Sequence, residues 1–173
     1  MKTVAVSTPG KAITLRDGSV VALRDANVND ENAVLELLRS LSIHAVSMRF
    51  GTVAVHLPSA ACGAAAHPGV IAFTPDGHCV GHAWYVETMA RRAEMALVVA
   101  DRYHGRGLGT ILVKRLTQMA ALRGIDVLEA YVLLDNAPMT ELLRDCGIPM
   151  RTRRDAGGTA FELDITPKIA SAA

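Results

Sequence analysis

The chain has 173 residues and a mass of 18.4 kDa, and 50% of its residues are hydrophobic while 20% are charged. This composition lies far from that of disordered segments, and the length suits a single domain. Eighteen basic and seventeen acidic residues leave a formal charge of +1, so no overall field draws the chain onto nucleic acid or a membrane, and we expect neither as a partner.

The first predicted elements are a hairpin and a helix. Short apolar runs at 12–15 and 20–24 flank an Asp-Gly pair, which favours a tight hairpin because glycine tolerates a positive φ. Asn29 and Asp30 are both good N-caps for the segment that follows, which runs to Leu41 with its leucines on one helical stripe. We expect an amphipathic helix there.

The middle of the chain is predicted to form a second helix and an antiparallel group of strands. Residues 42–50 fit a helix, whereas 51–69 are rich in alanine, proline and glycine and are expected to form a long mobile segment. Apolar runs at 70–74 and 79–87 flank a Pro-Asp-Gly turn, and residues 93–99 form another apolar strand.

The last part alternates helix and strand. Residues 107–123 carry leucines at helical spacing, 127–133 fit a strand, and 136–146 fit a helix with proline in its first turn. Residues 150–165 fit two strands around a Gly-Gly pair.

Together these elements predict an α+β fold. We expect a twisted, mostly antiparallel sheet of about six or seven strands flanked by about four helices. The domain is expected to span residues 12–166, with flexible ends at 1–11 and 167–173.

The apolar segments and the cysteines favour a cytoplasmic protein. The most apolar stretch, residues 53–73, is interrupted by histidine, proline and glycine, whereas a membrane span needs about 20 apolar residues. The chain reaches Ser7 and Pro9 before a signal-type apolar core could form, so export is not expected. Three cysteines without C-x-x-C spacing argue against a disulfide framework or structural zinc.

The residues that carry chemistry lie where the strand at 93–99 enters a glycine-rich turn and then a helix. The turn reads His104-Gly105-Arg106-Gly107-Leu108-Gly109. Glycines let backbone N–H groups approach a ligand, and a helix N-terminus carries roughly half a positive charge. With Arg102 and Lys114 nearby, this pattern predicts a phosphate or pyrophosphate site; the alternative is a turn that merely needs glycine.

Two common phosphate-binding patterns do not fit. Gly109 is followed by Thr110 and Ile111 rather than by the Lys-Ser/Thr pair of a Walker A loop. The spacing of Gly105, Gly107 and Gly109 is not that of a dinucleotide fingerprint, and too little chain follows for a doubly wound sheet.

The turn resembles the acyl-CoA loop of the GNAT superfamily of N-acetyltransferases, whose pattern is [Gln/Arg]-x-x-Gly-x-[Gly/Ala]. Asn136 stands where the family has a cofactor-contacting Asn, and Gly147 closes the next helix at the family's spacing. The similarity spans residues 81–148. Residues 13–19 and 41–50 look like the opening of the Pat-type bacterial protein lysine acetyltransferases, which acetylate acyl-CoA synthetases and other proteins.

This resemblance implies a GNAT fold, acetyl-CoA as co-substrate and no metal. It also implies a protein partner such as an acyl-CoA synthetase. The backbone of the strand before the loop would pair with the pantetheine arm, and the loop would hold the pyrophosphate. The implied cofactor-binding residues are Leu97, Val98, Val99, His104, Gly105, Arg106, Gly107, Leu108, Gly109, Thr110 and Asn136.

Two positions depart from the family pattern. His104 replaces the usual Gln or Arg, and Leu143 stands where many members have a tyrosine that acts as general acid. The sequence therefore predicts a proton donor other than a residue at position 143, such as water.

Glu94 is the predicted general base. A lysine with a pKa of about 10.4 costs roughly 4.6 kcal/mol to deprotonate at pH 7, so a base is needed. Glu94 lies ten positions before His104, as the catalytic Glu does in several GNAT protein acetyltransferases. Its neighbours Ala93, Met95 and Ala96 predict an apolar setting for the carboxyl. The alternative is an ordinary exposed glutamate.

Two other functions stay open. A small-molecule amine acetyltransferase would need a deep acidic pocket, and no acidic cluster is evident in the sequence. A non-catalytic acyl-CoA-binding module would not need Glu94. A metal site at His78, Cys79 and His82 is disfavoured because these residues straddle a strand start and lack a fourth ligand. The oligomeric state is not predicted.

Overall fold

The computed structural model describes residues 10–52 and 54–167, which form one eight-stranded sheet and five α-helices. The strand order is β1-β2-β3-β4-β5-β6-β8-β7. The strands are β1 Lys11–Thr14, β2 Val20–Asp25, β3 Gly69–Phe73, β4 Cys79–Met89, β5 Arg92–Val99, β6 Val127–Leu133, β7 Met150–Arg154 and β8 Gly158–Asp164. The helices are α1 Glu31–Arg39, α2 Ile43–Phe50, α3 Leu57–Ala65, α4 Leu108–Leu122 and α5 Ala137–Asp145.

The α+β prediction is confirmed, with more elements than expected. Every apolar run identified in the sequence forms a strand of the same sheet, so the sheet has eight strands rather than six or seven. The predicted flexible ends, 1–11 and 167–173, fall almost entirely outside the described residues, and β1 already begins at Lys11. No helix within the described residues is long and apolar enough to cross a membrane.

The helix that the sequence did not predict is α3, which lies in the segment expected to be a long mobile region. The side chain of His56 caps its first turn, and Pro58 is the second residue of the helix, where a missing N–H costs nothing because the first helical N–H groups have no partner within the helix. Ala61, Ala64 and Ala65 are buried, because side chains this small let α3 approach α1 closely. The alanine-rich composition therefore reflects tight helix packing.

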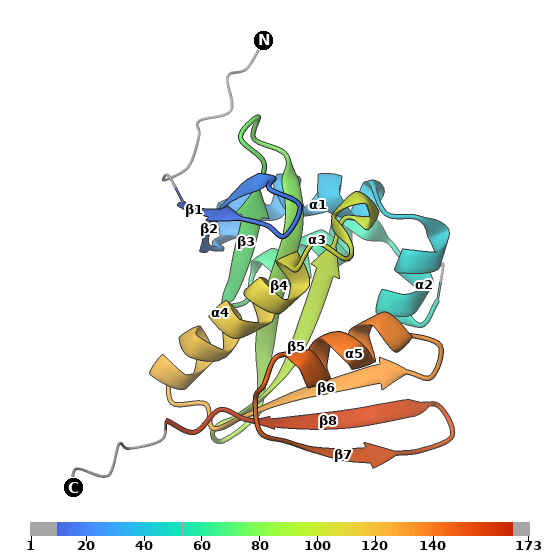
Figure 1. Cartoon of the computed structure of the whole chain (residues 1–173). Coiled ribbons are helices and arrows are strands. Elements are labelled where there is room, and N and C mark those ends of the chain that lie inside the picture. The colour runs from blue at the N-terminus through green and yellow to red at the C-terminus, as the bar shows by residue number, and fades with distance from the viewer. Residues whose placement is uncertain (1–9, 53, 168–173) are drawn as a thin grey trace, which may run out of the picture.

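Helices cover the two faces of the sheet unequally (Figure 1). On one face α4 packs on the central strands, where a side chain at Gly81 would contact Leu112 at 2.7 Å. The helices α1 and α3 cover the opposite face of the same strands, and α1 buries Val34, Leu37 and Leu38. The helix α5 lies on the α4 side, so the other face of β6, β8 and β7 is left open.

The feature that positions the site is the separation of β5 from β6. These parallel strands pair only at Arg92–Val127, Ala93–Leu128 and Glu94–Glu129. Beyond Glu94, β5 continues along β4 while β6 continues along β8, and Figure 1 shows the two strands fanning apart. Residues 95–99 of β5 therefore have no strand partner on this side, and their backbone groups face a gap in the sheet.

Candidate active site

The fan between β5 and β6 opens into a cleft of about 470 Å³. Its walls come from residues 95–99 of β5, 130–132 of β6, the helix α2, and the starts of α4 and α5. These segments are far apart in the chain, and the sheet topology brings them together.

The glycine-rich turn forms one end of the cleft. Gly105 and Gly107 have φ values of +72° and +87°, which other residues rarely adopt. Gly107 is the N-cap of α4 and provides no side-chain cap, and the first helical hydrogen bond runs from the Ile111 N–H to its carbonyl, at 3.2 Å. The N–H groups of residues 108–110 are therefore available at this end, as an anion site requires.

Gly109 has a different role from the other two glycines. It lies inside α4, where a Cβ atom would collide with the side chain of Leu142 on α5. Its absence of a side chain lets α5 pack against the first turn of α4. One glycine of the sequence pattern thus serves helix packing, while two serve the turn itself.

His104 can replace the usual Gln or Arg because its ring is bonded within the turn. Its Nε2 atom donates to the carbonyl oxygen of Val99 at 2.9 Å, which fastens the loop to the end of β5. Asn136 is the N-cap of α5, and its Oδ1 atom accepts the N–H of Met139 at 3.2 Å. The His104 side chain therefore fixes the turn, and the Asn136 side chain caps α5, both beside the cleft.

Most of the residues implied as cofactor-binding do line the cleft, and two of the predicted site residues do not. Glu94 and Arg106 lie outside its lining. The residues inside the lining are Leu97, Val98, Val99, His104, Gly105, Gly107, Leu108, Gly109, Thr110 and Asn136.

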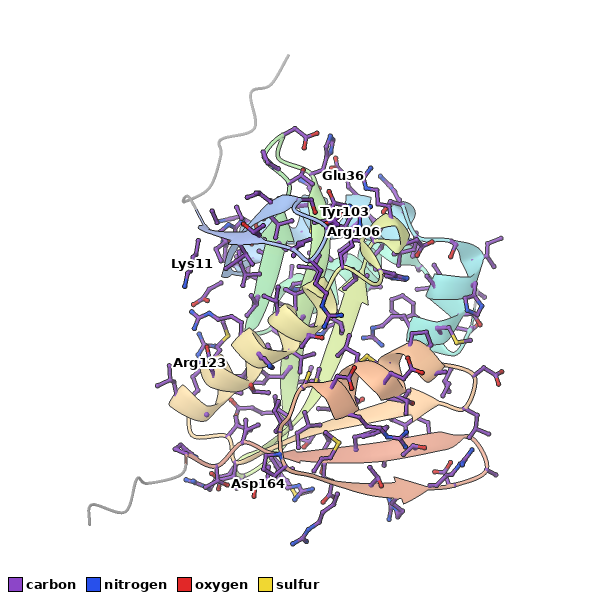
Figure 2. All side chains as sticks on the ribbon, viewed as in Figure 1. Lys11, Glu36, Tyr103, Arg106, Arg123 and Asp164 are labelled. Carbon is purple, nitrogen blue, oxygen red and sulfur yellow. The ribbon has the colours of Figure 1, made fainter. Side chains whose placement is uncertain are left out.

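Arg106 is engaged by the β1–β2 hairpin instead. Its Nη1 atom lies 2.7 Å from a carboxylate oxygen of Asp17, and its guanidinium stacks on Tyr103 at 4.9 Å (Figure 2). The Ser19 hydroxyl and the Arg106 charge hold the pKa of Asp17 below its usual value. The lining contains Arg16 from the same hairpin, a residue that the sequence analysis did not select because its proximity depends on the fold.

Glu94 is exposed at the point where β5 and β6 separate. Successive side chains of a strand point to opposite faces, so its neighbours Ala93 and Met95 are buried under α4 while Glu94 faces away. The apolar setting expected for this carboxyl is therefore wrong. Ala96 does share its face, next to Trp84 of β4.

Arg49 of α2 extends over this face near Glu94. Its guanidinium carbon lies 4.9 Å from the centre of the Trp84 ring, and its Nε atom is buried without a hydrogen-bond partner in the described residues. Burial lowers the pKa of Arg49, and the negative charge of Glu94 opposes that shift. The cleft thus has one arginine at each end, Arg16 at the loop and Arg49 near Glu94.

Two tyrosines line the cleft at positions other than 143, namely Tyr103 and Tyr131. Leu143 is completely buried. Tyr131 lines the cleft, but its hydroxyl donates to Asp155 at 2.7 Å, and this hydrogen bond raises the pKa of Tyr131. Tyr103 lies at the loop end, stacked on arginine. Water remains the predicted proton donor.

Four acidic residues from two parts of the chain line the cleft. Asp101 follows β5, while Asp135, Glu141 and Asp145 come from the start and body of α5, and all four line the cleft. Arg16 and Arg49 belong to the same lining, so the cleft carries charges of both signs.

The residues considered as metal ligands are unsuited to that role. His78 is exposed whereas Cys79 and His82 are buried, and burial raises the pKa of Cys79 to about 12, which disfavours the thiolate that would bind a metal. In residues 10–52 and 54–167 no group of three or more His, Cys, Asp or Glu side chains is placed to hold a metal ion.

Comparisons with known proteins agree with this geometry. A family model described as "Acetyltransferase (GNAT) family" matches residues 32–148. "Acetyltransferase Pat" of Mycolicibacterium smegmatis is 36% identical over 78 residues, a match that covers 45% of this chain and 23% of that protein.

Solved structures with the same fold cover nearly the whole chain. The GNAT domain of S. lividans PAT matches with a TM-score of 0.78 at 23% identity, over 89% of this chain and 96% of the other. YncA from Salmonella typhimurium, solved with its cofactor acetyl-CoA, matches with a TM-score of 0.68 at 19% identity, over 88% and 98%. A cAMP-binding acyltransferase from Mycobacterium smegmatis matches with a TM-score of 0.63 at 24% identity, over 92% of this chain but only 48% of that protein.

Proposed function

The chain belongs to the GNAT family of acetyltransferases, and from that premise we propose that it transfers an acetyl group from acetyl-CoA to the side-chain amine of a protein lysine. The observation that carries the proposal is the cleft between β5 and β6, which ends at the uncapped N-terminus of α4. An open strand edge followed by an anion site suits a long ligand with amide groups at one end and phosphates at the other.

The chain's own residues would hold such a ligand along its length. The unpaired edge of β5 offers backbone N–H and C=O groups to the amides of a pantetheine arm. The turn at Gly105 and Gly107 and the first N–H groups of α4 would hold the pyrophosphate. Acetyl-CoA supplies an activated acyl group as a thioester.

We assign the role of general base to Glu94. It lies at the closed end of the fan, beside the part of the cleft farthest along β5 from the glycine turn. Because Glu94 is outside the cleft lining, we infer that the amine's proton reaches it through a water molecule. The amine forms the new C–N bond, the C–S bond breaks, and CoA leaves as a thiolate, so the transfer is direct.

An exposed base favours a protein acceptor. Glu94 is exposed where β5 meets β6, beside the face of the sheet that stays open over β6 and β8, so a lysine on the surface of another protein can reach it. The proposal of a lysine acceptor comes from the resemblance to the Pat-type enzymes, and the chain matches Pat over only part of that protein's length. Acyl-CoA synthetases are the first acceptors to test.

A small cationic amine is the second candidate, and the acidic lining favours it. Asp135, Glu141 and Asp145 would attract a positively charged acceptor into the cleft. A polyamine would then be acetylated at least as well as a lysine-bearing protein.

The test is acetyl-CoA titration by calorimetry, followed by CoA-release kinetics on a lysine-bearing acyl-CoA synthetase and on an amine panel. We expect micromolar binding, and we expect Glu94→Gln to lower kcat on the order of a hundredfold or more while acetyl-CoA still binds. Glu87→Gln is the matched control, because Glu87 is an exposed glutamate on the neighbouring strand, opposite Ala93.

Each outcome separates the candidates. Binding with no turnover on any acceptor supports a non-catalytic acyl-CoA-binding module. Turnover that survives Glu94→Gln removes the role of Glu94 but keeps the transferase. A protein that binds neither acetyl-CoA nor CoA contradicts the proposal as a whole.

A further inference from the structure

Arg16 occupies the loop end of the cleft although it lies in the β1–β2 hairpin, far from the glycine turn in the sequence. It follows β1 in the hairpin turn, and it lines the cleft beside Gly107. A Cβ atom at Gly107 would lie 3.3 Å from the Arg16 Nε atom and 3.5 Å from its Cδ atom. The arginine side chain therefore passes directly over the N-cap of α4.

The hairpin is attached to the glycine turn at two points, so this position is held. The backbone N–H of Arg16 donates to the carbonyl of Arg106 at 3.1 Å. The carboxylate of the next residue, Asp17, pairs with the Arg106 side chain at 2.7 Å. One backbone bond and one ion pair thus fix the turn of the hairpin on the turn that precedes α4.

The other cations near the turn either form an ion pair or lie outside this end of the cleft. The charge of Arg106 is balanced by Asp17, and Arg102 lies over the Tyr103 ring at 5.5 Å, outside the cleft lining. Arg49 lies at the other end of the cleft. Lys114 lies further along α4, outside the lining. Within the described residues Arg16 makes no ion pair, so its guanidinium is the positive group of the lining that an anion at this end would meet.

From this arrangement we propose that Arg16 binds the pyrophosphate of the acyl-CoA together with the first N–H groups of α4. A guanidinium matches two phosphate oxygens at once, and the helix N-terminus supplies a complementary partial charge. The proposal rests on the proposed function, since it assumes that the cleft binds acyl-CoA. It moves the cationic contact from Arg106, which the sequence suggested, to a residue of the β1–β2 hairpin.

The test measures the binding of CoA, 3′-dephospho-CoA and inorganic pyrophosphate to the full chain, with pantetheine as a competitor, by calorimetry. We expect Arg16→Ala to weaken CoA and 3′-dephospho-CoA equally, by about tenfold, which is the loss of a charge-assisted hydrogen bond. We also expect it to weaken the binding of pyrophosphate about tenfold and to leave pantetheine binding, measured by competition, unchanged. Arg16→Lys keeps the positive charge but not the paired N–H donors of the guanidinium, so it should recover part of the lost CoA affinity.

The matched control is Lys11→Ala, which removes the same charge from the same hairpin at the far end of β1 (Figure 2). If both variants weaken CoA equally, the effect is one of overall charge and the proposal is wrong. It is equally wrong if Arg16→Ala binds CoA normally, if pantetheine binding falls too, or if 3′-dephospho-CoA shows no loss. If the wild-type chain binds pantetheine but not CoA, the proposal for Arg16 is wrong, although the cleft still binds the pantetheine arm. If it binds neither, the proposed function is wrong.

Discussion

The two ends of the cleft are built in different ways. The loop end is tied together by short-range bonds: His104 holds the end of β5, the hairpin holds Arg106, and glycines fix the turn. At the Glu94 end, α2 contributes no buried residue, and Arg49 is held by stacking on Trp84. The loop end is therefore the more rigidly held of the two, which suits a constant ligand such as the proposed acyl-CoA, whereas the Glu94 end suits acceptors of various shapes.

The largest effect is expected from His82, which lies beneath Trp84 at the Glu94 end of the cleft. The ring of His82 is completely buried, lacks hydrogen-bond partners among the described residues, and stacks on Trp84 at 4.8 Å. Burial lowers its pKa from 6.5 to about 4. Between these values the unfolded state binds the proton and the folded state does not. The free energy of unfolding is therefore unaffected by this titration above pH 6.5, and it decreases as the pH falls from 6.5 towards 4.

We therefore expect the free energy of unfolding to fall by up to about 3 kcal/mol between pH 7 and pH 4, as urea denaturation would measure. His82→Phe should remove most of this dependence, whereas His78→Gln, at an exposed site, should keep it. If His82→Phe loses as much unfolding free energy between pH 7 and pH 4 as the wild type does, other groups cause the acid sensitivity and the prediction for His82 is wrong.

A smaller effect is expected at the loop end, from Gly107→Ala. Alanine at a φ of +87° costs about 1–2 kcal/mol, and its Cβ atom would lie 3.3 Å from Arg16. We expect CoA to bind about tenfold more weakly, as measured by calorimetry, because both the N-cap and Arg16 must shift.

The far end of α4 offers a matched control for this variant. Gly124 has a φ of +85°, and a Cβ atom added there would meet no atom within 4 Å, so Gly124→Ala imposes the same backbone strain away from the cleft. It should lower stability by a similar amount and leave CoA binding intact. Equal weakening of CoA by both variants would mean that the loop end is not specially shaped for its ligand.

The same contrast explains how far the sequence could predict the site. The glycine turn follows from local spacing, because a strand, a turn and a helix that are adjacent in the chain are adjacent in space. Arg16 and Arg49 could not be selected that way, since each reaches the cleft from a separate element.

Two expectations failed for equally physical reasons. The apolar neighbours of Glu94 suggested a buried carboxyl, but alternation along β5 sends Ala93 and Met95 to the other face. The segment at 51–69 suggested a mobile region, because alanine gives no amphipathic pattern. Its burial in α3 becomes visible only once α1 is placed against it.

Asp101 links the two ends, and the smallest of the predicted effects concerns it. One carboxylate oxygen accepts the backbone N–H of Ser42, the N-cap of α2, at 3.0 Å, while the other is buried without a partner in the described part of the chain. Asp101→Ala should therefore loosen α2 and raise the KM for a protein acceptor about fivefold, the equivalent of about 1 kcal/mol, with the affinity for acetyl-CoA changed less than twofold. Asp135→Ala removes the same charge from the lining without touching α2. An equal rise in KM for both variants would assign the effect to charge, and weaker acetyl-CoA binding in Asp101→Ala alone would show that the loop end depends on α2 and is not shaped independently of it.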